Sequence, residues 1–312
     1  MDPVILFFVL GLAGTLLKSD IKIPEPFYNV LSIYLLVAIG MKGGIELYNS
    51  DIPYLYIPAV GTILLGIITT LIAFGILVLS RKFDLTNAIA IAMHYGSVSA
   101  VTYAVVTNFL EIQKVSYEQY STVLLVLLEV PAIIVGGSLA RFLVNKNKSE
   151  SHIKEMIHEI FLGKSVLLLI GGLIIGYYMA YSNNFKLNIF FADLFRGFLS
   201  LFLLEMGIVT GAQLSGLKKV GIFLGLFGIF MPLISASVGI IGGKLFGLSL
   251  GGSVVLGTMC ASASYIAAPA AVQMILPKAN PTFYMTASLG ITFPFNIIFG
   301  IQIFYWMAKL IY

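Results

Sequence analysis

The chain has 312 residues, of which 59% are hydrophobic and only 10% are charged, and its mean hydropathy is +1.00. Soluble domains are about half apolar and about a quarter charged, so this composition excludes an ordinary water-soluble protein. The formal net charge of +4 comes from short stretches between long apolar runs. We therefore attribute the positive charge to the loops that determine membrane topology, and we predict no nucleic-acid partner. The single cysteine, Cys260, excludes a disulfide framework.

Ten apolar segments follow one another along the chain, each near the length of about 20 residues that spans a bilayer as a helix. They cover 3–17, 27–47, 54–79, 85–110, 120–144, 165–182, 190–214, 220–246, 249–276 and 282–311. The first segment lacks the basic start of a signal peptide, so we interpret it as a helix that stays in the protein. The sequence thus predicts an all-α polytopic membrane protein with about ten transmembrane helices.

An internal repeat relates the two halves of the chain at a nearly constant offset of about 165 residues. Because each half holds an odd number of spans, the second half would enter the membrane upside down relative to the first. We therefore predict two inverted five-helix repeats, residues 1–144 and 165–312, joined by a linker over 145–164. The matches are Leu36, Gly40, Gly44 and Leu47 with Leu203, Gly207, Gly211 and Leu214, then Ser97-Val98-Ser99 with Ser262-Ala263-Ser264, and Pro131 with Pro294.

Basic residues are distributed unequally between the two predicted faces of the membrane. If the N-terminus lies outside, twelve basic residues fall on the inner side and six on the outer side. Inner loops of membrane proteins carry an excess of Lys and Arg. The bias predicts a multi-pass protein of the inner (plasma) membrane, with both termini outside and the linker in the cytoplasm.

The linker itself is strongly polar but carries Ile153, Met156, Ile157, Ile160 and Phe161 at helical spacing. This pattern predicts a short amphipathic helix. Such a helix would lie on the inner leaflet of the membrane or offer a docking surface to a soluble regulator. The sequence leaves both alternatives open.

Two Ser-x-Ser motifs, Ser97 to Ser99 and Ser262 to Ser264, lie near the middle of the fourth and ninth segments. Gly96 precedes the first motif, and Ala-Ala-Pro follows the second, so both helices are expected to break there. Interrupted helices at equivalent places in inverted repeats indicate a binding site near the bilayer midplane. Freed backbone N–H groups and serine hydroxyls suit a small anion that still carries a proton. The alternative is that these small residues only permit close helix packing.

A coupling sodium ion would bind hydroxyls, side-chain amides and carbonyls freed at helix breaks. Thr292 and Asn296 stand four residues apart and flank Pro294, whose missing N–H frees a carbonyl one turn earlier. The candidate sodium ligands are Thr102, Ser264, Ser288, Thr292, Asn296 and Glu129.

Two acids, Glu129 and Glu205, lie within predicted spans, where a charge costs at least about 2.5 kcal/mol. Each would neutralise a cation or take up a proton. Each would equally pair with a base such as Lys42 or Arg196 for structural reasons. The sequence does not decide between these roles.

A series of short motifs runs through nearly the whole chain and, taken together, resembles the SbtA-type sodium-dependent bicarbonate permeases. These motifs are Ile23-Pro24, Ile39-Gly40-Met41, Gly43-Gly44-Ile45, Gly96, Val98-Ser99, Thr102, Phe195-Arg196-Gly197, Leu199-Ser200, Met206-Gly207, Lys218-Lys219-Val220, Ser249-Leu250-Gly251-Gly252, Ala261-Ser262, Ser264, Ile266, Pro269 and Ala279-Asn280-Pro281.

The resemblance implies ten spans in two inverted repeats, a homotrimer, sodium-coupled uptake of bicarbonate, and an anion site at the crossed, broken helices four and nine. It also implies a PII-like cytoplasmic regulator, which the short linker of this chain would bind differently or not at all. No organic cofactor is predicted. Carried over by position, Ser99, Thr102, Ser262 and Ser264 would line the anion site. Gly96, Ser97 and Tyr265, which neighbour them in the two motifs, complete the candidate residues of this site.

Tyr265 is a departure from the resemblance, because the family motif has an acidic residue at this position. Ala263 and Ala267 replace two further hydroxyl or flexible positions. An acid beside the site would be a natural cation ligand. Tyr265 therefore bears on both the sodium stoichiometry and the substrate.

The sequence favours a secondary active transporter, a sodium-coupled symporter of a small monovalent anion that works by alternating access, with bicarbonate as the leading candidate. The alternatives are a bile-acid-transporter-like carrier of a larger organic anion and a passive anion channel, which would need rings of charge around a pore. An enzyme is not predicted, since the chain contains no HExxH motif and no paired intramembrane aspartates.

Overall fold

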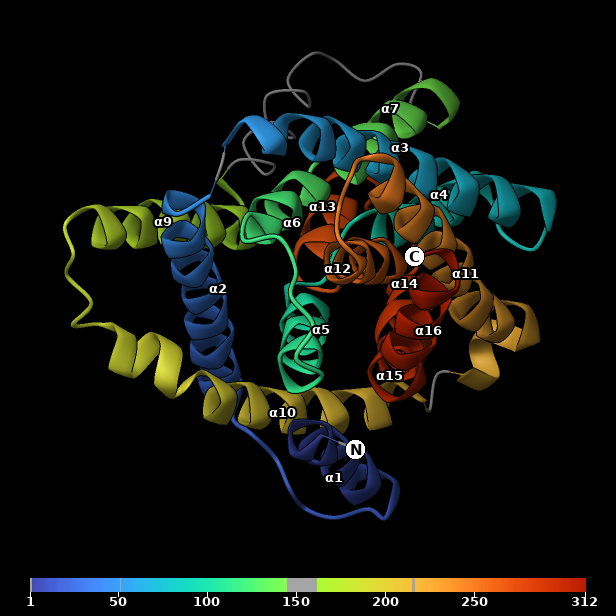
Figure 1. Ribbon diagram of the computed structural model, residues 1–312. Coiled ribbons are helices and arrows are strands. Elements are labelled where there is room, and N and C mark those ends of the chain that lie inside the picture. The colour runs from blue at the N-terminus through green and yellow to red at the C-terminus, as the bar shows by residue number, and fades with distance from the viewer. Residues whose placement is uncertain (1, 51, 145–161, 215–216) are drawn as a thin grey trace.

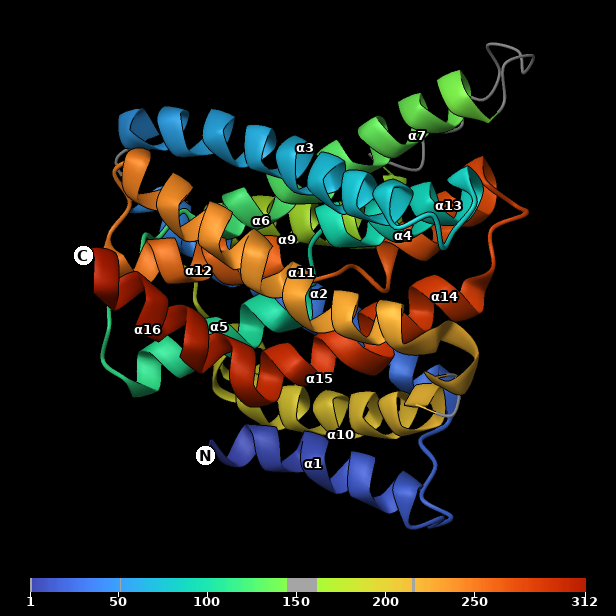
Figure 2. The same ribbon diagram turned by 90° about the vertical axis from the view of Figure 1, so that its right-hand side faces the viewer.

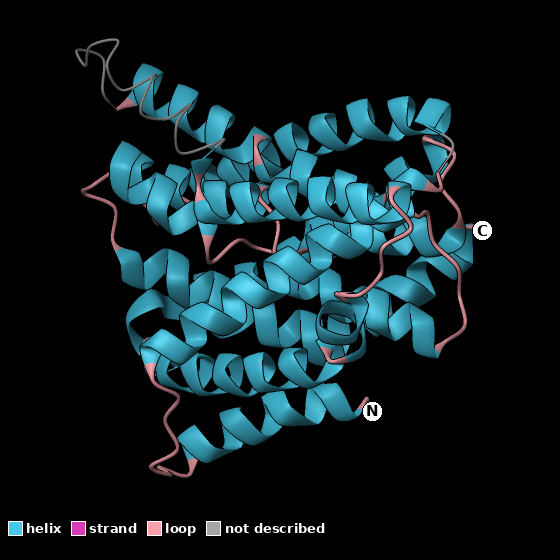
Figure 3. Ribbon diagram, turned by 90° about the vertical axis from the view of Figure 1, so that its left-hand side faces the viewer, coloured by secondary structure: helices cyan, strands magenta, loops and turns pink. Residues whose placement is uncertain are grey.

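The computed structural model describes residues 2–50, 52–144, 162–214 and 217–312, and this part of the chain folds into helices and loops without a strand (Figure 3). The first half contains α1 (Pro3–Leu16), α2 (Glu25–Tyr48), the 3-10 turn η1 (Ile52–Leu55), α3 (Tyr56–Leu79), α4 (Leu85–Gly96), α5 (Ala100–Ile112), α6 (Ser121–Glu129) and α7 (Pro131–Leu143). The second half contains α9 (Lys164–Tyr181), η2 (Ile189–Asp193), α10 (Phe195–Leu214), α11 (Leu217–Leu245), α12 (Leu250–Ala261), α13 (Ala267–Ile275), α14 (Pro281–Met285), η3 (Thr286–Thr292), α15 (Phe293–Phe295), η4 (Asn296–Gly300) and α16 (Ile301–Ile311).

Within the described residues, eight helical stretches are long and apolar enough to cross a membrane. The all-helical, multi-pass prediction is therefore confirmed. Two of the ten predicted segments are present as shorter apolar helices, Pro3–Leu16 and Leu250–Ala261. The eight stretches are Glu25–Tyr48, Tyr56–Leu79, Leu85–Ile112, Ser121–Leu143, Lys164–Tyr181, Phe195–Leu214, Gly221–Leu245 and Pro281–Ile311.

Several spans are interrupted where the sequence carries proline or paired serines. The stretch Leu85–Ile112 is made of α4 and α5, and α6 gives way to α7 at Pro131. The last span contains two π-helical stretches, η3 and η4, on either side of Pro294. A proline removes one backbone donor, so the helix around it has to find another hydrogen-bond register.

Glycines bring the first helix of each half against the second helix of the other half. Helix α1 lies along α10 (Figures 1 and 2), and α2 packs against α9. A Cβ atom on Gly207 would lie 2.1 Å from the carbonyl oxygen of Phe8, and one on Gly44 would lie 2.1 Å from the carbonyl oxygen of Leu173. Small residues allow such close backbone contact between helices in membranes. These two glycines belong to the matches that defined the internal repeat.

The crossing helices α4 and α12 are anchored at their N-termini by the opposite half of the chain. Asp84 caps α4 by accepting from the N–H of Asn87, and the Asn87 side chain accepts from the N–H of Asn280 at 2.8 Å. Ser249 caps α12, and its own N–H donates to the carboxylate of Glu118 at 2.6 Å. Each half therefore fixes where the broken helix of the other half begins.

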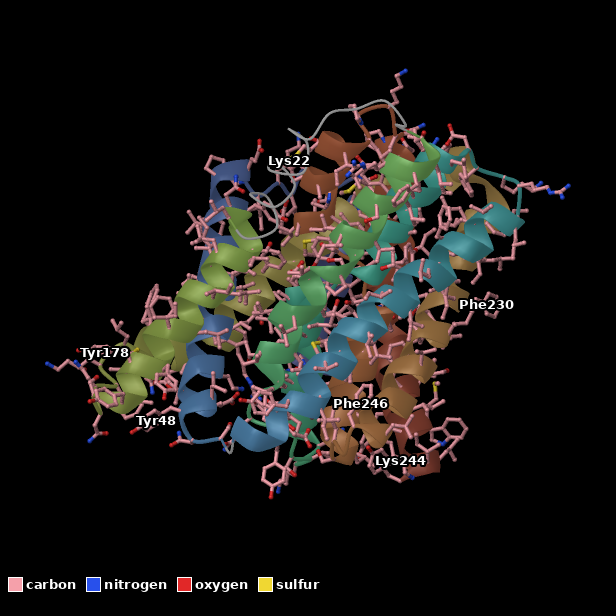
Figure 4. All side chains as sticks on the ribbon, turned by 90° about the horizontal axis from the view of Figure 1, so that it is seen from above. Lys22, Tyr48, Tyr178, Phe230, Lys244 and Phe246 are labelled. Atoms are coloured by element: carbon pink, nitrogen blue, oxygen red, sulfur yellow. The ribbon has the colours of Figure 1, made fainter. Side chains whose placement is uncertain are left out.

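Exposed apolar and aromatic side chains cover the outside of the bundle, as lipid contact requires. Tyr48 and Tyr178 lie at the same edge of the molecule, where α2 and α9 end, whereas Lys22 lies towards the opposite end from Lys244 (Figure 4). The ring of Tyr48 stands edge-on to Tyr177 at 5.3 Å. Amphipathic rings of this kind gather at the water boundary of a membrane.

The amphipathic helix predicted in the linker falls on residues 145–161, which lie outside the described part of the chain. The second half begins with α9 at Lys164, the last residue of the predicted linker. The division into 1–144, 145–164 and 165–312 stays a prediction.

Candidate functional site

The first break separates α4 from α5 and contains Ser97, Val98 and Ser99. Ser97 has extended backbone angles, φ −94° and ψ 176°, so the helix stops at Gly96. Ser99 then starts the next helix, because its Oγ accepts from the N–H of Thr102 at 3.2 Å. The N-terminus of α5 is therefore placed in the middle of the protein, where these residues are buried.

The second break separates α12 from α13 and runs from Ser262 to Ile266. Ser262 is extended, with φ −78° and ψ 165°, and its Oγ donates to the carbonyl of Met259 at 2.7 Å. The Ser264 Oγ accepts from the N–H of Ala268 at 3.2 Å, in the first turn of α13. A second helix N-terminus thus begins within the buried centre of the molecule.

The two breaks hydrogen-bond to each other in a reciprocal way. The N–H of Ser99 donates to the Oγ of Ser262 at 2.9 Å, and the N–H of Ser264 donates to the carbonyl of His94 at 2.9 Å. The Ser99 Oγ also donates to the hydroxyl of Tyr265 at 3.2 Å. The serine motifs that the sequence paired therefore lie in contact, and Tyr265 joins them.

A small cavity of about 10 Å³ lies beside this contact and is lined by polar groups from both breaks. Such a volume holds about one water molecule or a bare ion. Ser99, Ser264 and Tyr265 line it, together with Glu129. Part of the predicted anion site, namely Ser99, Ser264 and Tyr265, thus lies beside Glu129, a predicted sodium ligand.

Glu129 lies at the end of α6, and its Oε2 accepts from the Ser97 Oγ at 3.2 Å. Glu129 is 2% exposed, so the acid is held inside the protein next to the first break. The sequence left open a pairing of this acid with Lys42 or Arg196. Both of those bases form ion pairs with Glu111 instead, at 2.6 Å and 3.6 Å.

Thr102 and Gly96 are buried at the first break and serve the backbone there. The N–H of Thr102 is the group that Ser99 caps. A Cβ atom on Gly96 would lie 1.7 Å from the Oγ1 of Thr70, so only glycine fits against α3 at this position. Gly96 thus allows the close packing that lets α4 end at the centre of the protein.

The candidates in the last span lie in three different surroundings. Asn296 reaches the second break, because its Nδ2 donates to the carbonyl of Ala261 at 2.8 Å while its Oδ1 is buried without a partner among the described residues. The Thr292 hydroxyl donates to the carbonyl of Gly228 at 2.6 Å and contacts the Tyr95 hydroxyl. The Ser288 Oγ donates within its own helix, to the carbonyl of Tyr284. The hydroxyl of Ser288 is therefore engaged in a hydrogen bond within the last span, and that of Thr292 in hydrogen bonds to the neighbouring helices α11 and α4.

Ser165 is a further polar residue of the cavity that the sequence did not single out. It stands in the first turn of α9 and is 3% exposed. Leu36 of α2 also lines the cavity. Leu36 belongs to the matches of the internal repeat, whereas Ser165 lies in no motif and reaches the cavity because α9 packs against α2.

No curated protein matches the sequence of this chain. A family match, in contrast, spans residues 3–309, nearly the whole chain, and the family is described as the Na+-dependent bicarbonate transporter superfamily. This is a family of transport proteins, which agrees with the prediction of a transporter and with the absence of a predicted enzyme activity. The chain, with its two broken helices meeting at a polar cavity, belongs to the Na+-dependent bicarbonate transporter superfamily.

Proposed function

We propose that this protein is a sodium-coupled symporter of a small monovalent anion, with bicarbonate as the leading candidate. The observation that carries the proposal is the reciprocal contact between the two breaks, Ser99 to Ser262 and Ser264 to His94, beside a small polar cavity. Family membership supports the same function.

The anion would bind where two helices begin, at the N-termini of α5 and α13. Helix N-termini carry partial positive charge and unpaired N–H groups, which favour an anion. The hydroxyls of Ser99, Ser262 and Ser264 both donate and accept, which suits bicarbonate because it carries a proton of its own. In the conformation described here the cavity is too small for this anion, so binding requires the two breaks to move apart.

The sodium ion would bind close to the anion, with Glu129 supplying the negative charge. Glu129 lines the cavity with Ser264, and Thr102 lies in the first turn of α5 next to it. Asn296 offers a buried Oδ1 without a partner beside the end of α12. Oxygen ligands of this kind at helix breaks are what a coupling sodium ion needs. Ser288 and Thr292 remain candidates that would have to give up their present hydrogen bonds.

Alternating access would arise from two inverted repeats of five spans each. The equivalent packing of α1 on α10 and of α2 on α9 supports the repeat. Lys22 and Lys244 lie towards opposite ends of the bundle, which is compatible with the predicted topology because that topology puts them on opposite faces of the membrane. The helices α1, α2, α9 and α10 would form one bundle, against which the crossed helices move.

Two observations bear on the alternatives. Family membership favours bicarbonate over the large organic anion of a bile-acid-transporter-like carrier. An internal repeat within one chain favours a carrier over a channel, which would need rings of charge around a pore. The homotrimer and the PII-like regulator stay predictions from the family resemblance.

The experiment is uptake of radiolabelled bicarbonate into proteoliposomes under an inward sodium gradient, with a potassium gradient as the control. We expect sodium-dependent uptake by the wild-type protein and its loss in Ser264→Ala, with unchanged thermal unfolding as evidence that the variant is folded. Uptake that is equal in sodium and potassium would overturn the coupling. No uptake by the folded wild-type protein would overturn bicarbonate as the substrate and direct attention to Tyr265.

A further inference from the structure

A second polar cavity, of about 190 Å³, lies away from the two breaks, between α2, α5, η2 and α10. In Figure 1, α2 and α5 stand side by side, with α10 running across their lower ends. Lys42 and Arg196 line this cavity from α2 and α10, and Asn108 and Glu111 line it from α5. We call it the Lys42 cavity. It is large enough for a small oxyanion and its hydration water.

The cations of the Lys42 cavity share one carboxylate. Lys42 Nζ lies 2.6 Å from Glu111 Oε1, and the Arg196 guanidinium lies 3.6 Å from Glu111 Oε2. The three side chains are 42% to 56% exposed, so the cavity opens to water. Exposed ion pairs contribute little to stability, and an incoming anion would therefore displace Glu111 from one cation without a large penalty.

Asn108 provides an observation of a different kind. Its Nδ2 donates to the carboxylate of Asp2, which fixes the orientation of the amide, because an amide oxygen facing a carboxylate would be repelled. The Oδ1 of Asn108 is buried without a partner among the described residues, and the side chain is 4% exposed. A buried acceptor without a partner is costly, so this oxygen calls for a proton donor, which would reach it when the lining of the cavity opens.

The neighbouring groups limit what this ligand is. The phenol of Tyr117 accepts from Lys42 Nζ at 3.3 Å, and burial raises its pKa against the opposing charge of Lys42, so the phenol beside this cation stays neutral. Asp193 also lines the cavity and adds a negative charge. Two cations, two carboxylates and one bare acceptor do not suit a multiply charged anion. They suit a monovalent anion that carries its own hydroxyl.

We propose that the Lys42 cavity is a second binding site, for a small monovalent oxyanion that bears a proton, of the hydrogencarbonate class. Lys42 and Arg196 bind its negative oxygens, and Asn108 Oδ1 accepts its proton. Glu111 is the internal competitor that holds the two cations until the anion arrives. The proposal rests on the proposed function for the identity of the anion, and it places a site at the end of α5 where the anion binds before it reaches the two breaks.

The test is equilibrium binding of ¹³C-labelled hydrogencarbonate to the purified protein, followed by NMR line broadening at constant ionic strength. Glu111→Gln removes the competitor and should tighten binding by up to about fivefold. Asp193→Asn removes a carboxylate that lines the same cavity without pairing with Lys42, and it should change the affinity by less than Glu111→Gln does. Lys42→Met and Arg196→Gln should each weaken binding by about tenfold.

Nitrate separates the role of Asn108 from that of the cations, because it is planar and monovalent but has no proton. Asn108→Leu should weaken hydrogencarbonate binding by about fivefold and leave nitrate binding unchanged. Thermal unfolding of each variant shows that it is folded. All measurements are repeated in a Ser264→Ala background, which impairs the site at the two breaks.

An unchanged or weakened affinity for hydrogencarbonate in a folded Glu111→Gln variant would overturn the proposal. An equal effect of Asp193→Asn would also overturn it, because the affinity would then follow the net charge of the cavity and not the pairing of Glu111 with the two cations. Failure of the proposed function is a separate result. It would appear as unimpaired hydrogencarbonate binding at the Lys42 cavity without any sodium-driven uptake into proteoliposomes.

Discussion

The two broken helices reach the same buried point by different local means. The first break is three residues long, and its N-cap, Ser99, supports the next helix with its own side chain. The second break is five residues long, and its N-cap, Ile266, has no side-chain hydrogen bond. Ser264, two residues earlier, supplies the acceptor there. The longer second break leaves room for Tyr265, which extends back to the first.

This difference indicates that the two breaks have different roles. At the first break each residue is fixed by packing or capping, as Gly96 against Thr70 and Ser99 on Thr102 illustrate. At the second break the side chains of Ser262 and Ser264 hold the backbone, so Tyr265 can change without rebuilding a cap. We infer that the first break sets the geometry and the second sets the chemistry.

The largest effect is expected from Gly96→Ala. The new methyl group would lie 1.7 Å from the Thr70 Oγ1 and 3.0 Å from the Thr70 Cα, so α3 or α4 has to shift. Overpacking of this kind costs typically about 1–3 kcal/mol, and contact with backbone raises the cost. We expect a clear loss of thermal stability in detergent and loss of sodium-dependent uptake.

Ala261→Gly is the matched control, because Ala261 precedes Ser262 as Gly96 precedes Ser97. It should cost only about 0.5–1 kcal/mol through backbone entropy. Thr70→Ala removes the closest atom and should rescue part of the loss in Gly96→Ala. Equal losses of thermal stability in Gly96→Ala and Ala261→Gly would contradict the inference that packing constrains the first break more tightly than the second.

A smaller but more specific effect is expected from Glu129→Gln. The amide keeps the shape of the side chain and can still accept from Ser97, but the negative charge beside the first break is lost. If Glu129 balances the sodium ion, the sodium concentration for half-maximal uptake should rise by about tenfold, which corresponds to about 1.4 kcal/mol. The measurement is initial uptake rate against sodium concentration.

The control for Glu129→Gln is Glu205→Gln, which neutralises the other buried acid of the spans. Glu205 lies on α10 and does not line the cavity at the two breaks. Its neutralisation should leave the sodium dependence within about twofold of wild type. Comparable shifts in the two variants would mean that the whole field of the protein, and not the cavity, determines sodium binding.

The sequence predicted the parts of this site that follow from helix periodicity and from the repeat. The repeat paired the motif Ser97–Ser99 with the motif Ser262–Ser264, and the two motifs are in hydrogen-bond contact through Ser99 and Ser262. Helix-breaking residues located the interruptions near Ser97 and Ser262, because glycine, serine and proline act on the backbone next to them. These are local rules, so one sequence suffices to apply them.

Other features depend on contacts between segments that no local rule connects. Ser165 lines the cavity only because α9 packs against α2, and nothing in its neighbourhood marks it. Lys42 and Arg196 were considered as partners of the intramembrane acids, yet both pair with Glu111 at the end of α5. The choice among several acids depends on distances of a few ångströms, which the spacing of charges along the chain does not specify.

The smallest and most selective change is Tyr265→Phe, which tests whether the second break carries the chemistry. The ring of Tyr265 stands edge-on to Phe293 at 5.3 Å, and phenylalanine would keep that packing. Only the hydroxyl that accepts from Ser99 is lost, at a cost of about 0.5–1.5 kcal/mol. If this hydroxyl takes part in binding, the KM for bicarbonate or sodium should change severalfold while thermal unfolding changes little. If the hydroxyl only joins the two breaks, stability should fall and both KM values should stay the same, and the adaptable chemistry would then have to lie in Ser262 and Ser264.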